Sequence, residues 1–264
     1  GDHLLDTHTH ILWNIDDGSK NQCMSLQMLE IAARSGTKAI FATPHVIERA
    51  NKPSWEEIKE KTQQLRQLCA EAQIDIMLYP GAEVQMNWEL LPELGATGAY
   101  CLNGGRYLLI ELPAAEIPAY ADEFWYELEL KGITPILAHP ERYQQLRENP
   151  DLLLLWRRRG MLMQCNSGSF TGMFGSSVCE NAKVLLANGL VDLLGSDGHR
   201  SEGRNTDMSR AAAVIRQLAG EEVLRQLTET NPQAILKNQE IELKQPKVLL
   251  EDKPKSFWQK LFGK

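Results

Sequence analysis

The sequence predicts an α/β protein in which a mostly parallel sheet forms a closed or distorted barrel within a single domain. Short apolar runs alternate along the chain with segments of helical apolar spacing, a pattern typical of parallel strands joined by helices. The first run lacks a following glycine-rich nucleotide loop, which favours a barrel over an open doubly wound sheet. A chain of 264 residues, 43% of them hydrophobic, is long enough for one such barrel.

Seven apolar runs are the predicted strands. Each is short enough to be a buried parallel strand. Several follow a glycine that can take the left-handed conformation and so close the preceding helix, namely Gly36, Gly132, Gly160 and Gly189. In chain order the predicted strands are Asp6–His10, Thr37–Thr43, Ile74–Tyr79, Arg106–Ile110, Ile133–His139, Met161–Asn166 and Leu190–Asp197.

The helices between these strands have recognisable starts. Residues from Met24 to Ala33 have apolar side chains at helical spacing. Ser54-Trp55-Glu56-Glu57 has the spacing of a capping box and predicts a helix start. Asn149-Pro150 and Asn231-Pro232 each predict a capping residue before a proline at the first helical position.

The composition excludes several classes of protein. A net charge of -7 and a pI near 5.5 oppose general nucleic-acid binding, which needs a basic surface. The longest apolar runs fall short of the ~20 residues that span a bilayer, and the N-terminus lacks the regions of a secretory signal. Five cysteines without a C-x-x-C pair suit reduced thiols, so we expect a cytoplasmic protein. Each cysteine also lacks the arginine of a C-x5-R loop, which argues against a cysteine-nucleophile phosphatase.

Side chains suited to metal binding occur at the ends of most predicted strands. Alternation along the first strand places Asp6, His8 and His10 on one face. The carboxyl ends of barrel strands meet at one face of the molecule, so ligands from other strands should join them there. A single histidine after a strand is more often an ordinary loop residue, but repetition at equivalent strand ends indicates a site. The further candidates are His45, Glu83, Glu111, His139, Asp197 and His199.

The donor types indicate the kind of site. Imidazoles and carboxylates without thiolates, with more carboxylates than one zinc ion needs, suggest a multinuclear site for manganese, iron or zinc. Arg142 and Arg204 follow two of the candidate ligands closely in sequence. A guanidinium beside a cluster of cations is unfavourable unless an anion lies between them, and it binds phosphate oxygens bidentately. We therefore predict a phosphate role for both arginines, with a salt bridge to a surface carboxylate as the alternative.

These motifs resemble the PHP (polymerase and histidinol phosphatase) superfamily. The resemblance is to the bacterial manganese-dependent protein-tyrosine phosphatases encoded with capsule and exopolysaccharide genes. It extends from about Leu5 to Leu236 and implies a distorted (β/α)7 barrel with three metal ions, which we place at residues 1–240. The matching motifs are Asp6-Thr7-His8-Thr9-His10, Asp16-Asp17-Gly18, Thr43-Pro44-His45, Gly81-Ala82-Glu83, His139-Pro140-Glu141-Arg142-Tyr143 and Ser196-Asp197-Gly198-His199.

The resemblance also implies which residues bind each ion, with Mn2+ expected and Fe or Zn as alternatives. The first ion would be held by His8, His10, Glu83 and Asp197. Glu83 would bridge to a second ion, held by Glu111 and His139. A third ion would be held by Asp17, His45 and His199. Arg142 and Arg204 match the substrate-binding arginines, although Asn205-Thr206 replaces the prolines expected after Arg204. Asp6 is expected to orient the metal-bound imidazoles by accepting their second N–H.

The function implied by this resemblance is hydrolysis of phosphotyrosine on a protein. The expected partner is a membrane-associated bacterial tyrosine kinase that controls polysaccharide synthesis. Two alternatives stay open: a small-molecule phosphatase of the same superfamily, acting on a compound such as histidinol phosphate, or a catalytically silent metal-binding module that regulates a kinase.

Residues 241–264 form a predicted C-terminal tail beyond the resemblance. Its last part, Lys253–Lys264, is basic and aromatic, and its apolar side chains fall on one side of a helical turn. We expect peripheral contact with an anionic membrane surface, because lysines and aromatic side chains favour that interface. The alternative is that the aromatic side chains cover an apolar patch of the barrel or of a second subunit.

Overall fold

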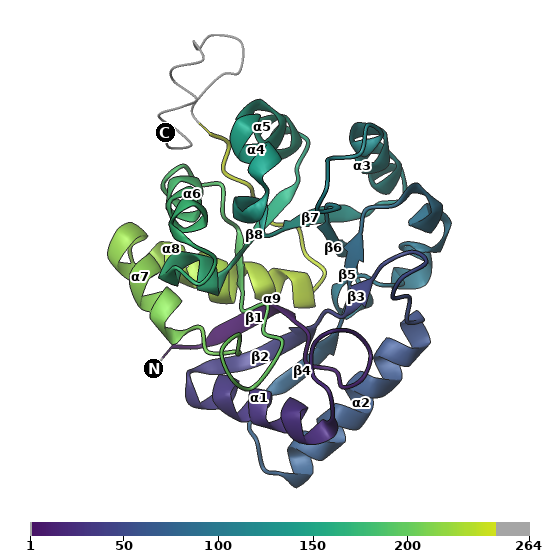
Figure 1. Cartoon of the computed structure of the whole chain (residues 1–264), viewed down its shortest axis with the longest axis vertical. Helices are drawn as coiled ribbons and strands as arrows, with labels where there is room; N and C mark the ends of the chain where they lie inside the picture. The colour runs from purple at the N-terminus through teal and green to yellow at the C-terminus, as the bar shows by residue number, and fades with distance from the viewer. Residues whose placement is uncertain (1, 247–264) are drawn as a thin grey trace.

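The computed structural model describes residues 2–246, in which parallel strands curl around a common centre and helices surround them (Figure 1). Within this range one sheet has the order β1-β2-β4 and the other the order β3-β5-β6-β7-β8-β9, and every pairing within these sheets is parallel. The strands are β1 (Leu4–Thr9), β2 (Thr37–Ala42), β3 (His45–Val46), β4 (Met77–Pro80), β5 (Glu83–Gln85), β6 (Tyr107–Glu111), β7 (Thr134–Ala138), β8 (Leu162–Asn166) and β9 (Leu193–Gly195). The predicted single-domain distorted barrel is confirmed.

All seven predicted strands are present, and two of them are followed after a break by a short strand that was not predicted. After Thr43-Pro44 the chain passes from β2 into β3, and after Gly81-Ala82 it passes from β4 into β5. At both breaks the chain leaves the three-stranded sheet and joins the six-stranded one. A side chain at Gly81 would come within 2.6 Å of Leu102 Cδ2, so glycine permits the close approach there. The breaks explain the distortion, and a ligand candidate follows each of them.

The other junction between the sheets lies beside β1 and β9. Asp197 N donates to His8 O at 2.7 Å, and His10 N donates to Gly198 O at 2.9 Å. Residues separated by most of the chain therefore meet at this end of the barrel, where the first and last candidate motifs lie.

Nine α-helices lie within residues 2–246, together with shorter 3-10 and π turns. They are α1 (Gln22–Arg34), α2 (Trp55–Glu71), α3 (Ala121–Leu130), α4 (Gln144–Glu148), α5 (Pro150–Arg158), α6 (Ser176–Ala187), α7 (Ser209–Ala219), α8 (Glu221–Arg225) and α9 (Asn231–Leu236). The shorter turns are η1 (Trp88–Glu93), η2 (Ala96–Gly98), η3 (Leu102–Gly104), η4 (Pro140–Arg142), η5 (Ser167–Thr171) and the π turn η6 (Gln226–Thr230).

The predicted helix starts have different outcomes. Ser54 caps α2 as expected, because its Oγ accepts a hydrogen bond from Glu57 N at 3.1 Å. Asn149 precedes α5, but its side chain makes no capping hydrogen bond. The prediction for Asn231 is wrong: it has helical dihedral angles and continues the run from α8 through η6 into α9. Its Nδ2 donates instead to Asp192 O at 2.8 Å, a tertiary contact that its sequence position does not reveal.

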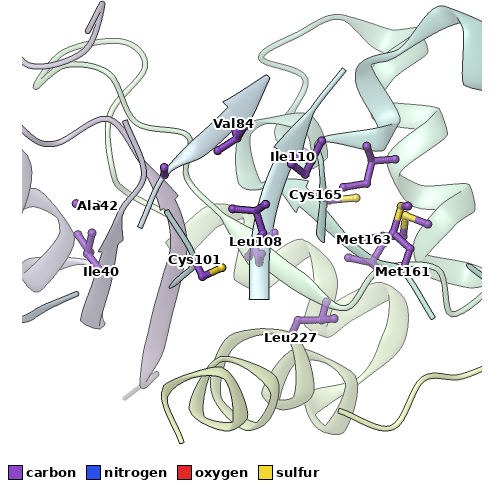
Figure 2. Packing of buried hydrophobic residues seen from close by; sticks show 14 of the residues in the cluster. Ile40, Ala42, Val84, Cys101, Leu108, Ile110, Met161, Met163, Cys165 and Leu227 are labelled. Carbon is purple, nitrogen blue, oxygen red and sulfur yellow. The ribbon is translucent and has the colours of Figure 1, made fainter. Parts of the chain in front are cut away.

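The apolar core fills both faces of the strands. On β2, Ile40 belongs to a larger cluster and Phe41 to a smaller one, as alternation along a strand requires. Figure 2 shows side chains of the larger cluster, including Ile40, Leu108 and Met163. On β8, Leu162 of the smaller cluster shares a face with Gln164 and Asn166, which lie further along the strand. That face therefore changes from apolar to polar toward the carboxyl end.

Candidate metal centre

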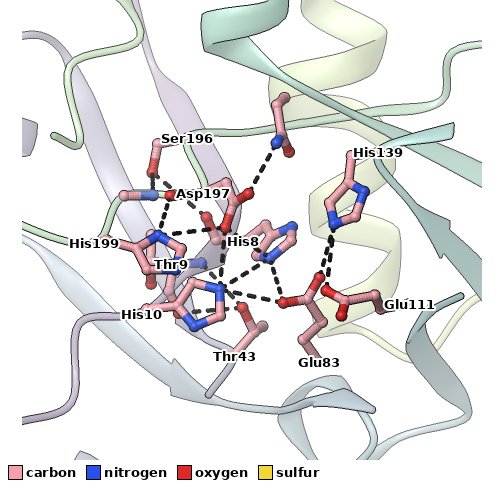
Figure 3. Close-up of polar contacts among 12 residues, drawn as sticks. His8, Thr9, His10, Thr43, Glu83, Glu111, His139, Ser196, Asp197 and His199 are labelled. Atoms are coloured by element: carbon pink, nitrogen blue, oxygen red, sulfur yellow. Dashed lines mark hydrogen bonds and ion pairs between the residues drawn. The ribbon is translucent and has the colours of Figure 1, made fainter. Parts of the chain in front are cut away.

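The structure brings all nine predicted metal ligands to the carboxyl ends of the strands. Figure 3 shows seven of them directed toward one another: His8, His10, Glu83, Glu111, His139, Asp197 and His199. The other two, Asp17 and His45, lie within ion-pair distance of this set. Potential ligand atoms fall into three overlapping groups, within each of which all atoms lie within 4.8 Å of one another.

The first group consists of His8, His10, Glu83 and Asp197. Glu83 Oε1 lies 3.2 Å from Nε2 of both His8 and His10. Asp197 Oδ1 lies 3.2 Å from His8 Nε2 and 3.0 Å from His10 Nε2. All four side chains are buried, so two imidazoles and two carboxylates converge away from solvent. This is the predicted first ligand set.

The second group consists of His45, Glu83 and Glu111, so His45 stands where His139 was predicted. His139 lies beside this group, with its Nε2 3.1 Å from Glu83 Oε2 and 3.5 Å from Glu111 Oε2. His45 Nδ1 lies 3.3 Å from Glu83 Oε1 and 4.0 Å from Glu111 Oε2. Glu83 thus faces the first group through one oxygen and His139 through the other, as a bridging carboxylate would.

The third group is the most open. Asp17 Oδ1 lies 3.5 Å from His45 Nε2 and 3.4 Å from His199 Nε2. His10 also belongs here, since its ring stacks on that of His199 with centroids 4.0 Å apart. The Asp17 side chain is 69% exposed, so this group faces solvent.

Two side chains that the sequence analysis missed orient the first two histidines. Gln164 Oε1 lies 2.8 Å from His8 Nδ1, and Asp16 Oδ2 lies 2.8 Å from His10 Nδ1. Because these oxygens accept hydrogen bonds, each Nδ1 carries a proton and each Nε2 is the ring nitrogen that faces the centre. Gln164 could have been noticed as a polar residue in the apolar run Met161–Cys165.

The role predicted for Asp6 is wrong. Its Oδ1 accepts hydrogen bonds from the backbone N–H groups of His8 at 3.1 Å and Ser196 at 2.8 Å. Among the hydrogen bonds of residues 2–246, none joins Asp6 to an imidazole ring. Burial raises the pKa of Asp6 to about 6. Asp6 therefore connects β1 to the segment after β9, because its carboxylate binds backbone amides and not an imidazole ring.

The charges of the cluster fit divalent cations. Burial alone would raise the pKa of Glu83 and Asp197, but the neighbouring imidazoles hold both well below the usual range. Burial alone would lower the pKa of His139, yet contacts with Glu111 and Glu83 raise it to about 10. Among protein groups alone, protons on imidazoles balance the buried carboxylates, a task that metal ions can take over.

Buried polar atoms without a hydrogen-bond partner also indicate a metal site. Within residues 2–246, the buried atoms without a hydrogen-bond partner include Asp197 Oδ1, His45 Nδ1 and His139 Nδ1. Asp197 and His139 also have left-handed backbone conformations, with φ of 52° and 38°. Unpaired polar atoms and strained backbone each cost free energy and cluster at functional sites. A nitrogen and oxygen donor set without thiolate suits manganese, iron or zinc.

Both predicted arginines lie beside the cluster. Arg204 Nη2 is 2.5 Å from Asp197 Oδ2, and Arg142 Nη1 is 3.6 Å from the same oxygen. Asn166 Nδ2 also donates to this oxygen, at 2.9 Å, so Oδ1 is the oxygen that faces the histidines. Both arginines line one open cleft of about 670 Å³, together with seven of the nine ligands: Asp17, His45, Glu83, Glu111, His139, Asp197 and His199. The alternative interpretation was that the arginines form a salt bridge with a surface carboxylate. The carboxylate that both arginines approach is Asp197, which is buried.

The segment after Arg204 is well anchored despite its departure from the expected prolines. His199 N donates to Arg204 O at 2.9 Å, which folds the loop back on itself. Thr206 is fully buried, and its Oγ1 donates to Met28 O at 2.5 Å. A hydrogen bond to α1 therefore fixes the loop at this point.

The comparisons with known proteins agree with this geometry. A family model described as capsular polysaccharide synthesis, CpsB/CapC, matches residues 4–237. The chain belongs to this family. Its resemblance to capsule-associated phosphatases of the PHP type, inferred from the motifs, is thereby confirmed.

Relatives of this CpsB/CapC chain include the tyrosine-protein phosphatase YwqE of Bacillus subtilis. The two are 34% identical over 238 residues, which cover 90% of this chain and 93% of YwqE. This chain also matches a solved structure with a TM-score of 0.88 and 33% identity. That structure comes from work on YwqE and on CpsB from Streptococcus pneumoniae, which are described as metal-dependent tyrosine phosphatases. That match covers 93% of this chain and 99% of the solved one. The predicted activity class agrees with the activity named for these relatives.

A more distant solved structure shares only the fold. Histidinol phosphate phosphatase from Lactococcus lactis matches with a TM-score of 0.54 and 16% identity, over 84% of this chain and 95% of its own. At this identity the similarity supports the barrel and gives no information about substrate.

Proposed function

We propose that this chain is a metal-dependent phosphatase that hydrolyses phosphotyrosine on a protein. The observation that carries the proposal is the convergence of three overlapping ligand groups at one open cleft, which seven of the nine ligands and both arginines line. The names of the relatives support the same activity, since YwqE is a tyrosine-protein phosphatase.

The ligand assignment is part of the proposal. His8, His10, Glu83 and Asp197 would hold one ion, and Glu83 would bridge to a second held by Glu111 and His139. Asp17, His45 and His199 would hold the third, with His10 close enough to contribute. We propose Mn2+ as the ion in use, with Fe or Zn able to occupy the same donors.

The protein's own residues prepare the site for phosphoryl transfer. Bound ions would supply Lewis acidity and lower the pKa of water in the cleft from ~15.7 toward neutrality. Gln164 and Asp16 hold His8 and His10 in the tautomer that presents Nε2. Arg142 and Arg204 would bind the phosphoryl oxygens and share the charge that develops on them. A phenolate leaves with less protonation than an alkoxide, so a tyrosine ester needs no dedicated general acid.

The proposed substrate is a tyrosine-phosphorylated protein, with a membrane-associated bacterial tyrosine kinase as the partner. The family's description links it to capsular polysaccharide synthesis. Across residues 2–246 the structure contains no helix with the length and apolar character to cross a bilayer. The membrane contact predicted for Lys253–Lys264 lies outside the described residues, as does most of the predicted tail.

The test is a side-by-side measurement of turnover on a phosphotyrosine peptide and on histidinol phosphate with Mn2+ present. We expect a clear preference for the peptide in kcat/KM, loss of activity on chelation and recovery when Mn2+ is added back. Preference for histidinol phosphate would favour the small-molecule alternative. Metal binding without turnover of either substrate would favour a silent regulatory module.

A reagent for thiols provides the control. Iodoacetamide should leave most activity in place, because three of the five cysteines, Cys69, Cys101 and Cys165, are buried. Burial also raises the pKa of the Cys165 thiol well above its usual range, which keeps it protonated. Complete inactivation by iodoacetamide with metals retained would contradict the metal-based mechanism.

A further inference from the structure

One aromatic side chain lies against both arginines of the cleft. The guanidinium carbon of Arg142 is 4.0 Å from the centroid of the Phe174 ring, and that of Arg204 is 5.3 Å from it. Arg142 comes from η4, after β7, and Arg204 from the loop after β9. Phe174 comes from the intervening segment between η5 and α6, so one ring connects two otherwise separate parts of the site.

The turn that carries Phe174 has a backbone conformation that depends on two glycines. Gly172 and Gly175 on either side have φ of 85° and 95°, a conformation that other residues rarely adopt. Gly175 N donates to Gly172 O at 3.1 Å and closes the turn. The turn therefore fixes where the ring stands.

The same scaffold holds the turn of Arg142. The buried Glu141 side chain accepts hydrogen bonds from Ser169 Oγ at 2.6 Å and from Asn166 N at 2.9 Å. These contacts tie η4 to η5, the segment that leads into Phe174. Ring and guanidinium are therefore positioned by one connected set of hydrogen bonds.

The Phe174 ring reduces the repulsion between the two arginines. Both guanidiniums approach Asp197 Oδ2, at 2.5 and 3.6 Å, and so place two like charges close together. An aromatic face attracts a cation through its quadrupole, and it also restricts a planar guanidinium to few orientations. Without the ring, both side chains would have more freedom to turn toward solvent, since they are only partly buried.

We propose that Phe174 is a positioning residue that holds Arg142 and Arg204 in the orientation in which they bind phosphate. The inference rests on the proposed function only in taking the cleft to be a phosphate site. Phe174 acts through the arginines and does not itself contact the reacting atoms.

The test measures binding of inorganic phosphate to the Mn2+-loaded protein by calorimetry. Phe174→Leu should weaken phosphate binding about tenfold, the scale of two partly exposed cation–π contacts. Phe174→Trp should stay close to the unaltered protein, because it restores an aromatic face. Met173→Ala is the matched control: Met173 is in the same turn, is 47% exposed, and should leave phosphate affinity unchanged. Metal content should be the same in all three variants.

A double-variant comparison separates positioning from a structural role. In an Arg142→Ala, Arg204→Ala background, Phe174→Leu should have no further effect on phosphate binding. An equal loss in that background, or unchanged affinity in the single variant, would overturn the proposal. A loss confined to aryl phosphates, with inorganic phosphate unaffected, would also overturn it, because the ring would then contact the substrate.

The two proposals fail in different ways. If the protein binds phosphate but does not hydrolyse phosphotyrosine, the proposed function is wrong, and the phosphate measurements still decide the role of Phe174.

Discussion

Two buried clusters of charge in this protein are built in opposite ways. In the first, Arg157 and Asp192 form a bidentate ion pair, with contacts of 2.5 and 2.7 Å. The remaining donor capacity of Arg157 goes to three backbone carbonyls, of Lys244, Met161 and Gly189. In the second, the cluster at the barrel mouth, carboxylates and imidazoles converge while Asp197 Oδ1 and two ring nitrogens lack hydrogen-bond partners.

This difference indicates that the first cluster stabilises the fold and the second serves function. A buried ion pair with every donor used is complete, and it joins α5, the segment before β9 and the C-terminal segment at Lys244. A buried cluster whose lone pairs face a common centre is complete only with a cation bound. Removing a charge at the first cluster should therefore destabilise the fold without changing the chemistry of the site, whereas removing one at the second should inactivate the protein.

The largest effect is expected on activity from Asp197→Asn. The change keeps the shape of the side chain but removes a ligand charge, so kcat/KM should fall by about a thousandfold, the several kcal/mol that a metal ion contributes. The melting temperature without metal should also fall, because the lowered pKa of Asp197 means that its charge stabilises the folded protein. Near-normal activity with full metal content would remove Asp197 from the ligand set.

Arg157→Met should have the converse effect. It leaves Asp192 buried without its partner and should cost about 3–5 kcal/mol of unfolding free energy. The kcat/KM of the folded fraction should be unchanged, as urea unfolding and low-temperature kinetics can check. Arg158→Met is the matched control, since Arg158 is the exposed neighbour on the same helix. Similar losses in both variants would show that the ion pair is not the cause.

Arg142→Ala tests the arginines within the functional cluster. It should lose about 3 kcal/mol of transition-state stabilisation, the scale of one missing oxyanion donor. Its metal content should stay normal, in contrast to His139→Ala, which should lose metal. Metal analysis and kinetics on the two variants separate these roles.

Gln164→Leu should have a smaller effect. Removing the group that orients a ligating imidazole usually lowers metal affinity by about ten- to a hundredfold. Titration with Mn2+ should show weaker binding, with activity restored at high Mn2+. Equal affinity in the variant would mean that His8 is oriented without Gln164.

Over a single pH unit, the smallest effect is the dependence of metal binding on pH. The pKa of His139 is raised to about 10, so in metal-free protein a proton occupies the ring at neutral pH. Mn2+ must displace that proton, and its apparent affinity should rise with pH up to about pH 10, roughly tenfold per unit for each proton released. A pH-independent affinity between pH 6 and 8 would indicate an imidazole that is already neutral.

The sequence predicted most of the second cluster and none of the first. Ligand candidates such as His139 and Asp197 were visible because each follows an apolar run, and strand ends of a barrel must meet. The partners Gln164 and Asp16 were missed because orientation depends on contacts across the barrel that spacing does not encode. Arg157 was missed for a similar reason: in the sequence it is one of three consecutive arginines, and only packing distinguishes it.

The same limit explains the errors in local structure. Asn231 has the sequence of a helix cap, but a contact with the backbone of Asp192 lets the helix continue through it. The predicted strands ended at Thr43 and Tyr79, and the short strands β3 and β5 that follow were not predicted, since nothing local shows that a chain changes sheets. Phe174 was overlooked because its role depends on two arginines from other loops.

The most direct test of the central claim is anomalous diffraction at the manganese edge from crystals of the Mn2+-loaded protein. We predict three peaks, one within each ligand group, with Glu83 between the first two. Peaks elsewhere, or no peak among His8, His10, Glu83 and Asp197, would contradict the assignment.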